Sequence, residues 1–385
     1  MSLVLTRYLY FLDECYYSLL FAITNKHTFN EVVFWASEIY FSGFKKGLIE
    51  FIWKLYYDFY AIQYPKYERK IEAKTKHLQQ SNDFKDCLYL LNLLYYSKVD
   101  HEVFLKRMLH AKTPSCHYIG RSPAWLKDMC IEYDLTKKEQ RYLRSINKNK
   151  MQNILYYIYI IKKGQEQRIY NITVAYFKKI RGLPLTPKSL DSISYKNKKH
   201  IIIALICYLN KDEHLIQKKL ILKKFSFDMG SVMRHHAEPC KRLRKTLTFK
   251  RNYSINHLIG LFSLKRNLHK DYKDIMRQQW EFYAFQSPIW QNRFNRFHAK
   301  PNMYSRQMDF INDDMLEEFY ENYNYEPDEE SLETQEKSII DIDEAKGIKW
   351  ILKKFHEFDI DILGNKGVIM KRVYYFALQT SRLFD

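Results

Sequence analysis

The stretch NEVVFWASEIYFSGFKKGLIEFIWKLYYDFYAI, residues 30–62, decides the fold class of this chain. Asn30 can cap a helix over 31–41, and Gly43 is placed to end it in a left-handed or turn conformation. A second apolar run predicts a helix over 45–62. Two antiparallel helices joined by a Ser-Gly turn make an αα-hairpin, which is the unit of helical solenoids.

The second of these helices carries very few charges. Glu50, Lys54 and Asp58 recur every four residues, so they form one narrow stripe on the helix surface. The rest of the circumference is apolar, and we therefore expect this helix to be almost completely buried.

Composition extends the helical prediction to the whole chain. The 385 residues are 46% hydrophobic and 16% aromatic, which suits a packed protein. Ten Gly and nine Pro are roughly half the average usage, so tight turns are scarce. The predicted fold is all-α, built of packed helical hairpins in a HEAT- or TPR-like array or an irregular bundle. Further helices are predicted over 83–97, 100–111, 122–132, 136–147, 150–163, 199–209, 212–224, 254–269, 271–286, 312–322, 345–358 and 366–382.

Local signals place some of the boundaries. Thr136 and Glu139 have capping-box spacing, and Ser122-Pro123 is typical of an N-cap followed by the first helical residue. Glycines, prolines and a Ser/Lys-rich run over 164–198 indicate a linker or hinge. The predicted organisation is an aromatic-rich helical module (1–163), this linker (164–198), a basic helical module (199–308), an acidic and partly disordered segment (309–344) and C-terminal helices (345–385).

Charge is strongly segregated along the chain. Residues 309–345 hold fifteen Asp and Glu and one Lys, a net of −14, whereas the whole chain is +19 and the remainder therefore +33. A basic body with an acidic segment implies an anionic partner and a built-in competitor for it. Aromatic residues would let this segment dock on the protein: Phe310, Phe319, Tyr320, Tyr323 and Tyr325.

The basic runs are candidate phosphate contacts, since neutralised phosphates release counterions in a largely sequence-independent way. The alternative is a solvated face. An aromatic and basic stretch over 280–306 could stack single-stranded bases, although core packing is the stronger interpretation. The candidate nucleic-acid contacts are Arg234, Lys241, Arg242, Arg244, Lys245, Lys250, Arg251, Lys198, Lys199, Arg293 and Arg296.

Catalytic and metal signals are weak. No phosphate-binding loop, dinucleotide fingerprint, nucleophile elbow or H-E-x-x-H motif occurs, and no small-molecule substrate or cofactor is indicated. Acidic pairs that could hold Mg²⁺ are commoner in helix caps and solvated segments. Two His/Cys groups lack the paired spacing of structural zinc sites: His235, His236 and Cys240, and His110, Cys116, His117 and Cys130. We expect a protein that is not an enzyme.

The six cysteines are widely spaced, so we expect reduced thiols in a cytoplasmic or nuclear space. No run of 18 apolar residues occurs, and no membrane span is predicted.

Three phrases, FWASEIYFSGF, IWKLYYDFYAIQYPKYE and EEFYENYNYEPDEESLETQEKSI, resemble an uncharacterised protein family of nucleocytoplasmic large DNA viruses, the giant viruses. The resemblance covers about a quarter of the chain and supplies no residue roles. It implies a location in a virus factory of the host cytoplasm or in the virion.

The expected function is that of a viral helical scaffold or adaptor that contacts nucleic acid and other viral proteins. The alternatives are a minor capsid protein, or a protein–protein hub that supports viral transcription or translation.

Overall fold

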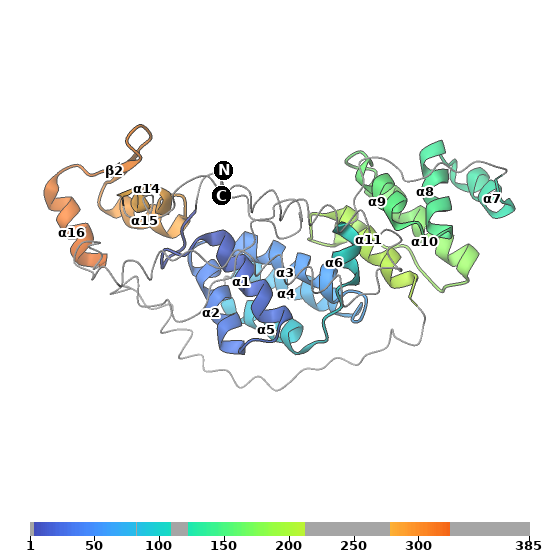
Figure 1. Ribbon diagram of the computed structural model, residues 1–385, viewed down its shortest axis with the longest axis horizontal. Coiled ribbons are helices and arrows are strands. Elements are labelled where there is room, and N and C mark those ends of the chain that lie inside the picture. Colours follow the sequence, from blue (N-terminus) through green and yellow to red (C-terminus); the bar gives the residue numbers. More distant parts are fainter. Residues whose placement is uncertain (1–3, 82, 109–121, 212–277, 324–385) are drawn as a thin grey trace, which may run out of the picture. The chain divides into compact units, whose positions relative to one another are not determined.

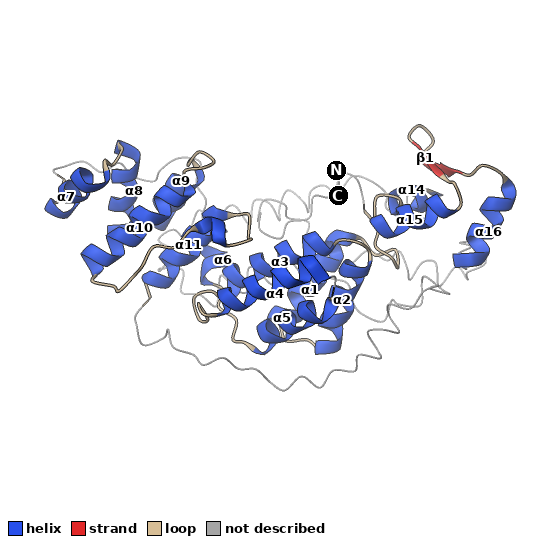
Figure 2. Cartoon of the chain, turned by 180° about the vertical axis from the view of Figure 1, so that it is seen from behind, coloured by secondary structure: helices blue, strands red, loops and turns tan. Residues whose placement is uncertain are grey.

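The computed structural model describes residues 4–81, 83–108, 122–211 and 278–323, and their regular secondary structure is helical apart from one short β-hairpin (Figures 1 and 2). The all-α prediction is confirmed. The helices predicted over 212–224, 254–269, 345–358 and 366–382 lie outside the described residues. The described chain forms two compact units. The first holds residues 4–52, 81, 83–96 and 278–323, and the second holds 53–80, 97–108 and 122–211.

The first unit is built on α1 (Leu12–Thr24), α2 (Phe29–Phe41) and α5 (Phe84–Tyr96), together with the first part of α3 (Lys45–Phe59). α2 packs mainly against α1 and α5, so the principal pair is α1 with α2 rather than the predicted hairpin of α2 with α3. The fully buried Trp35 meets the Tyr10 ring edge-on at 5.2 Å between centroids.

The cap of α2 lies two residues before the predicted Asn30. Thr28 is extended, and its hydroxyl accepts a hydrogen bond from the backbone N–H of Glu31 at 3.3 Å. Thr and Asn are both good caps, so sequence alone could not separate these positions. Gly43 has a φ of +95°, as its predicted role in ending the helix requires.

The burial predicted for α3 is confirmed from Leu48 to the end of the helix at Phe59. Its buried apolar residues are Leu48, Ile49, Phe51, Ile52, Trp53, Leu55, Tyr56, Tyr57 and Phe59. The helix ends at Phe59, three residues before the predicted end, and Asp58 of the predicted charge stripe is fully buried.

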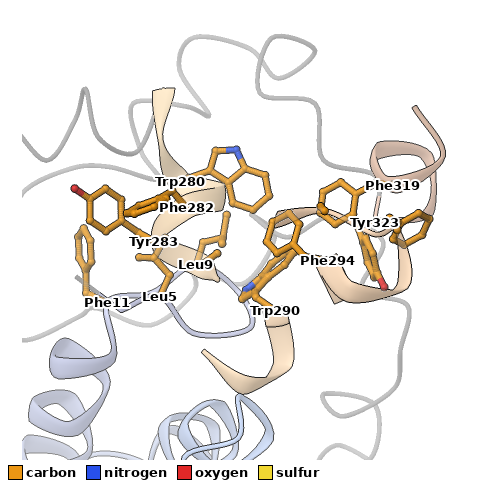
Figure 3. Close-up of a cluster of buried hydrophobic side chains, with 13 residues drawn as sticks. Leu5, Leu9, Phe11, Trp280, Phe282, Tyr283, Trp290, Phe294, Phe319 and Tyr323 are labelled. Atoms are coloured by element: carbon orange, nitrogen blue, oxygen red, sulfur yellow. The ribbon is translucent and has the colours of Figure 1, made fainter. Parts of the chain in front are cut away.

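Five further elements complete the first unit: α14 (Trp280–Ala284), α15 (Pro288–Arg296), strands β1 (Lys300–Asn302) and β2 (Gln307–Asp309), and α16 (Asp313–Tyr323). Their aromatic side chains form one buried cluster with residues near the start of the chain, namely Leu5, Leu9 and Phe11 (Figure 3). The indole N–H of Trp290 donates to the Thr6 carbonyl at 3.0 Å. The cluster therefore unites segments almost 300 residues apart in sequence.

The second unit contains α4 (Tyr67–Ser81), α6 (Glu102–Met108), α7 (Ala124–Tyr133), α8 (Lys137–Asn147), α9 (Met151–Tyr159), α10 (Glu166–Arg181), a 3₁₀ turn (Leu190–Ser192) and α11 (Lys198–Leu209), with α3 from Trp53 onward. α8 packs against α7, α9 and α10, and α11 packs against α6, α9 and α10. In a regular solenoid each repeat contacts only its neighbours. The packing in this unit is that of an irregular bundle.

The capping box of α8 is present as predicted, with Thr136 and Glu139 bonded reciprocally. The start of α7 lies one position later than predicted, because Pro123 occupies the N-cap and the helix begins at Ala124.

The predicted linker over 164–198 is wrong over its first half, because α10 occupies Glu166–Arg181 and buries six consecutive residues, from Ile172 to Phe177. Gly182 is the left-handed C-cap of that helix, with φ +69°. A glycine that looks like a linker in sequence therefore serves as a helix terminator.

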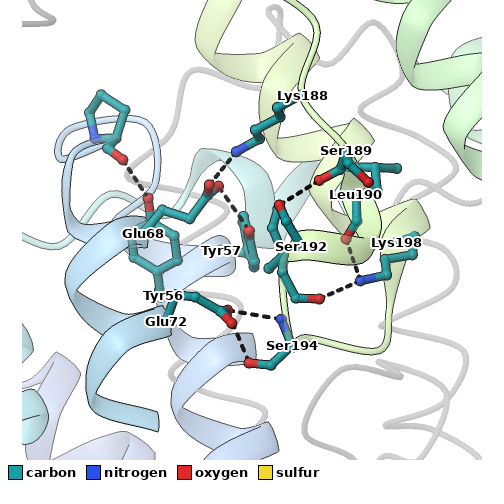
Figure 4. Close-up of polar contacts among 12 residues, drawn as sticks. Tyr56, Tyr57, Glu68, Glu72, Lys188, Ser189, Leu190, Ser192, Ser194 and Lys198 are labelled. Atoms are coloured by element: carbon teal, nitrogen blue, oxygen red, sulfur yellow. Dashed lines mark hydrogen bonds and ion pairs between the residues drawn. The ribbon is translucent and has the colours of Figure 1, made fainter. Parts of the chain in front are cut away.

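The loop after α10 is fastened to α4 (Figure 4). Lys188 pairs with Glu68, and Ser194 donates its backbone N–H and its hydroxyl to one Glu72 carboxylate oxygen at 2.8 and 3.0 Å. Tyr57 also donates its hydroxyl to Glu68 at 3.0 Å. These contacts hold the loop in place, which is inconsistent with a hinge at this point.

Within the described ranges, no helix combines the length and the apolar character needed to cross a membrane.

Candidate nucleic-acid interface

Seven of the eleven predicted phosphate contacts lie outside the described residues: Arg234, Lys241, Arg242, Arg244, Lys245, Lys250 and Arg251. The remaining four are Lys198, Lys199, Arg293 and Arg296. The structure places them in three different environments.

Lys198 and Lys199 serve the fold at the start of α11. The ammonium group of Lys198 donates to the carbonyls of Leu190 and Ile193 at 2.6 and 2.5 Å. The ammonium group of Lys199 donates to the carbonyls of Tyr159, the last residue of α9, and Ile161, at 3.0 and 2.7 Å. Both lysines are half-buried and tie loop carbonyls to the helix. Their charges are engaged within the protein, which the sequence run of lysines does not reveal.

Arg293 belongs to the core of the first unit, so its prediction as a phosphate contact is wrong. Its side chain is 1% exposed, and its guanidinium carbon lies 4.4 Å from the Trp290 ring centroid and 5.0 Å from that of Tyr323. Cation–π stacking between two rings explains why an arginine is stable there. Arg296, one turn later, is exposed.

The aromatic residues over 280–306 are mainly core residues, as the stronger interpretation held. The buried members are Trp280, Phe282, Tyr283, Trp290, Phe294 and Phe297. The exception is the turn of the β-hairpin, where Tyr304 is 100% exposed and Met303 is 76% exposed. The Asn302 side chain accepts hydrogen bonds from the backbone N–H groups of Tyr304 and Ser305, at 3.0 and 3.1 Å, and so fixes this turn.

The first part of the acidic segment forms α16, one residue from the predicted range of 312–322. Phe319 is fully buried and stacks on Phe294 at 4.7 Å, with an interplanar angle of 17°. Tyr323 is also buried, and the hydroxyl of Tyr320 donates to the Glu281 carboxylate at 2.8 Å. The acidic residues of this helix all face solvent: Asp313, Asp314, Glu317, Glu318 and Glu321. The helix thus docks through its aromatic face and displays its carboxylates.

A buried charge network lies in the second unit, at the meeting of α3, α6 and α11. The Asp58 carboxylate accepts from the guanidinium of Arg107 at 2.7 Å and lies 2.8 Å from His200 Nε2. The Tyr195 hydroxyl lies 2.9 Å from His200 Nδ1. In the consistent tautomer of a neutral imidazole, Tyr195 donates to Nδ1 and Nε2–H donates to Asp58.

The electrostatics of the network favour an ion pair beside a neutral histidine. Burial raises the pKa of Asp58, but the charge of Arg107 and the hydrogen bond from His200 outweigh it, and the pKa of Asp58 is lowered. Burial and the Arg107 charge lower the pKa of His200 to about 4. Burial likewise lowers the pKa of the nearby Lys54 to about 8. Because Asp58, Arg107 and His200 are all buried, we assign them to holding three helices together.

Metal and thiol groups offer no further site in the part of the chain that the structure describes. No group of three or more His, Cys, Asp or Glu residues there could hold a metal ion. His235, His236, Cys240, His110, Cys116 and His117 lie outside that part. Cys15, Cys87 and Cys207 are buried free thiols, and burial raises the pKa of each.

Sequence reasoning missed a basic surface on α7 to α10. Residues 122–181 contain thirteen Lys and Arg against five Asp and Glu, and most of these cations are exposed. The signal was present as helical spacing, because Lys137, Arg141, Arg144 and Lys148 fall on one face of α8. The run over 234–251 is denser in basic residues and therefore gives the stronger signal in the sequence.

Comparison with known proteins gives no relative. No protein-family model matches the chain, and neither curated proteins nor solved structures provide a significant match.

Proposed function

We propose that this chain is a non-enzymatic helical adaptor of a large DNA virus. It binds nucleic acid, or a comparable polyanion, through exposed basic surfaces and recruits viral proteins, in a virus factory of the host cytoplasm or in the virion. The viral setting rests on the sequence resemblance alone. The binding function is supported by the segregation of charge into a −14 segment and a +33 remainder.

The observation that carries the proposal is the orientation of α16. Its aromatic side chains hold it in a packed cluster, while five carboxylates point to solvent. An acidic helix fixed on a basic protein competes with external polyanions for basic surfaces, because it is always present at a high local concentration. The acidic segment therefore acts as a brake on binding.

The test measures binding of labelled single- and double-stranded DNA and RNA at several salt concentrations. Deletion of the whole acidic segment, 309–344, is not a suitable variant, because it would remove Phe319 and Tyr323 from the core. The better variant converts only the five exposed acids of α16 to amides: Asp313→Asn, Asp314→Asn, Glu317→Gln, Glu318→Gln and Glu321→Gln. We expect micromolar or tighter binding with a steep salt slope, and tighter binding by the variant. No binding by either protein near physiological salt would refute the proposal.

A protein–protein hub is the second candidate, and the β-hairpin turn favours it. Tyr304 and Met303 in the turn are exposed at 100% and 76%, and Ile311, just after β2, at 69%. Exposed aromatic and Met residues are typical interface anchors. A hub would retain viral proteins after nuclease treatment and lose them on Tyr304→Ala. The minor capsid alternative instead predicts abundance in purified virions.

A further inference from the structure

The outer face of α8 carries a regular row of cations. Lys137, Arg141, Arg144 and Lys148 follow one another at spacings of four, three and four residues. Such positions lie above one another on a helix, and eleven residues rise about 16 Å. The side chains of Lys137, Arg141 and Lys148 are exposed, and Lys138 is exposed beside the row.

The opposite face of α8 explains why the row must point outward. Tyr142, Leu143 and Ile146 are buried, and the Tyr142 hydroxyl shares a hydrogen bond of 2.7 Å with Thr173 of α10. The capping box fixes the first turn of α8. Arg144 donates to the Ser122 hydroxyl at 2.5 Å, which holds the middle of the row in place. The cations therefore sit on a rigid support.

No carboxylate interrupts this row. Glu139 lies on the buried side and is engaged by its cap and by Arg168, at 2.6 Å from Arg168 Nε. The turns at either end of α9 add further exposed cations, including Lys150 and Lys162. α4 of the same unit provides the contrast, since Glu68 and Glu72 alternate there with its basic residues.

We propose that the outer face of α8 is the phosphate-binding surface of this protein and that it takes the sugar–phosphate backbone of a nucleic acid. This inference rests on the proposed function and names its site. A nucleic-acid strand carries one phosphate per about 3.4 Å of duplex axis, so the row matches the length of about five phosphates. Contacts between lysine or arginine and phosphate carry no base information, so binding here is independent of sequence.

The test compares two triple variants of the full chain that lose the same charge. The first is Lys137→Gln, Arg141→Gln, Lys148→Gln on α8, which leaves Arg144 and its bond to Ser122 intact. The second, a control on α4 and the residue just before it, is Lys66→Gln, Arg69→Gln, Lys76→Gln. Both variants change residues with exposed side chains. Circular dichroism is used to check that each variant folds like the parent protein.

Binding of one labelled duplex is measured between 50 and 300 mM salt, within the range where counterion release dominates. Each lost phosphate contact lowers the magnitude of the slope of log K against log salt by about 0.9. The slope of the α8 variant is therefore expected to be smaller in magnitude by about 2 to 3, and its affinity at low salt to be at least tenfold weaker. The α4 control is expected to stay within about threefold of the parent.

Equal slopes for the parent and the α8 variant, with clear binding by both, would overturn this inference and leave the proposed function standing. An α4 control that weakens binding as much as the α8 variant would overturn it too, because net charge alone would then explain the effect. Failure of the parent protein to bind would overturn both.

Discussion

Replacing Asp58 by Asn is the sharpest test of the buried charge network. The carboxylate is fully buried and bonds to the buried guanidinium of Arg107 at 2.7 Å. The substitution preserves the shape of the side chain and removes only its charge. The Arg107 cation then remains in the protein interior without the anion that compensates its desolvation.

The magnitude follows from the distance. Two unit charges 2.7 Å apart attract one another by about 6 kcal/mol at an effective dielectric constant of about 20. Part of this is already offset by desolvation in the native protein, and removal of one partner of a buried pair costs about 3–5 kcal/mol. We therefore expect Asp58→Asn to destabilise the second unit by about 3–5 kcal/mol.

Native-state hydrogen exchange of backbone amides in α3, α6 and α11, followed at increasing urea, measures this loss within the second unit. Arg107→Leu and the double variant Asp58→Asn/Arg107→Leu complete a double-mutant cycle with Asp58→Asn. The double variant is expected to be at least about 2 kcal/mol more stable than the sum of the single changes predicts. A loss below about 1 kcal/mol for Asp58→Asn, or additive single changes, would refute the assignment of this pair as a compensated buried charge.

Three further predictions test other parts of the fold. Burial lowers the pKa of His200 to about 4, below its ordinary 6.5, so the unfolded state binds the proton more readily. The free energy of unfolding of the second unit should therefore fall by about 3 kcal/mol as the pH falls from 6.5 to 4. Urea unfolding at several pH values measures this, and the stability of His200→Gln should depend less on pH than that of the parent protein. Phe319→Ala should destabilise the first unit by about 3–5 kcal/mol, because it leaves a cavity in the core. Hydrogen exchange of the backbone amides over 278–323 measures this loss. Glu318→Ala, which changes an exposed neighbour, is the control and should have almost no effect. Gly43→Ala should cost about 1–3 kcal/mol in the same measurement, because φ is +95° and the added Cβ would lie 2.5 Å from Pro288 Cβ.

Helix prediction succeeded where local periodicity and caps agree. The capping box of α8 and the apolar circumference of α3 depend only on residues that are close together in the chain, so both can be recognised from the sequence. α4 was missed because most of its residues are polar. Its buried positions, Tyr67, Ile71, Thr75 and Leu78, nevertheless keep helical spacing, which was the available signal.

The errors in the candidate site have a different origin. Lys198 and Arg293 are cations in sequence, but a loop carbonyl engages Lys198, and the rings of Trp290 on α15 and Tyr323 on α16 engage Arg293. Whether a charge is exposed depends on such tertiary contacts, and no local pattern contains them. The amphipathic α8 is the exception, since its inner apolar residues fix which side its cations face.

Charges in this protein therefore fall into two classes that respond differently to salt. Asp58 and Arg107 form an ion pair shielded from solvent, and such pairs are screened only weakly. The row on α8 and the carboxylates of α16 face water, where interactions fade beyond about 8 Å at physiological ionic strength. Raising the salt concentration should consequently release a bound polyanion while the helices remain folded. Salt thus separates the charges that build the fold from those that we propose bind nucleic acid.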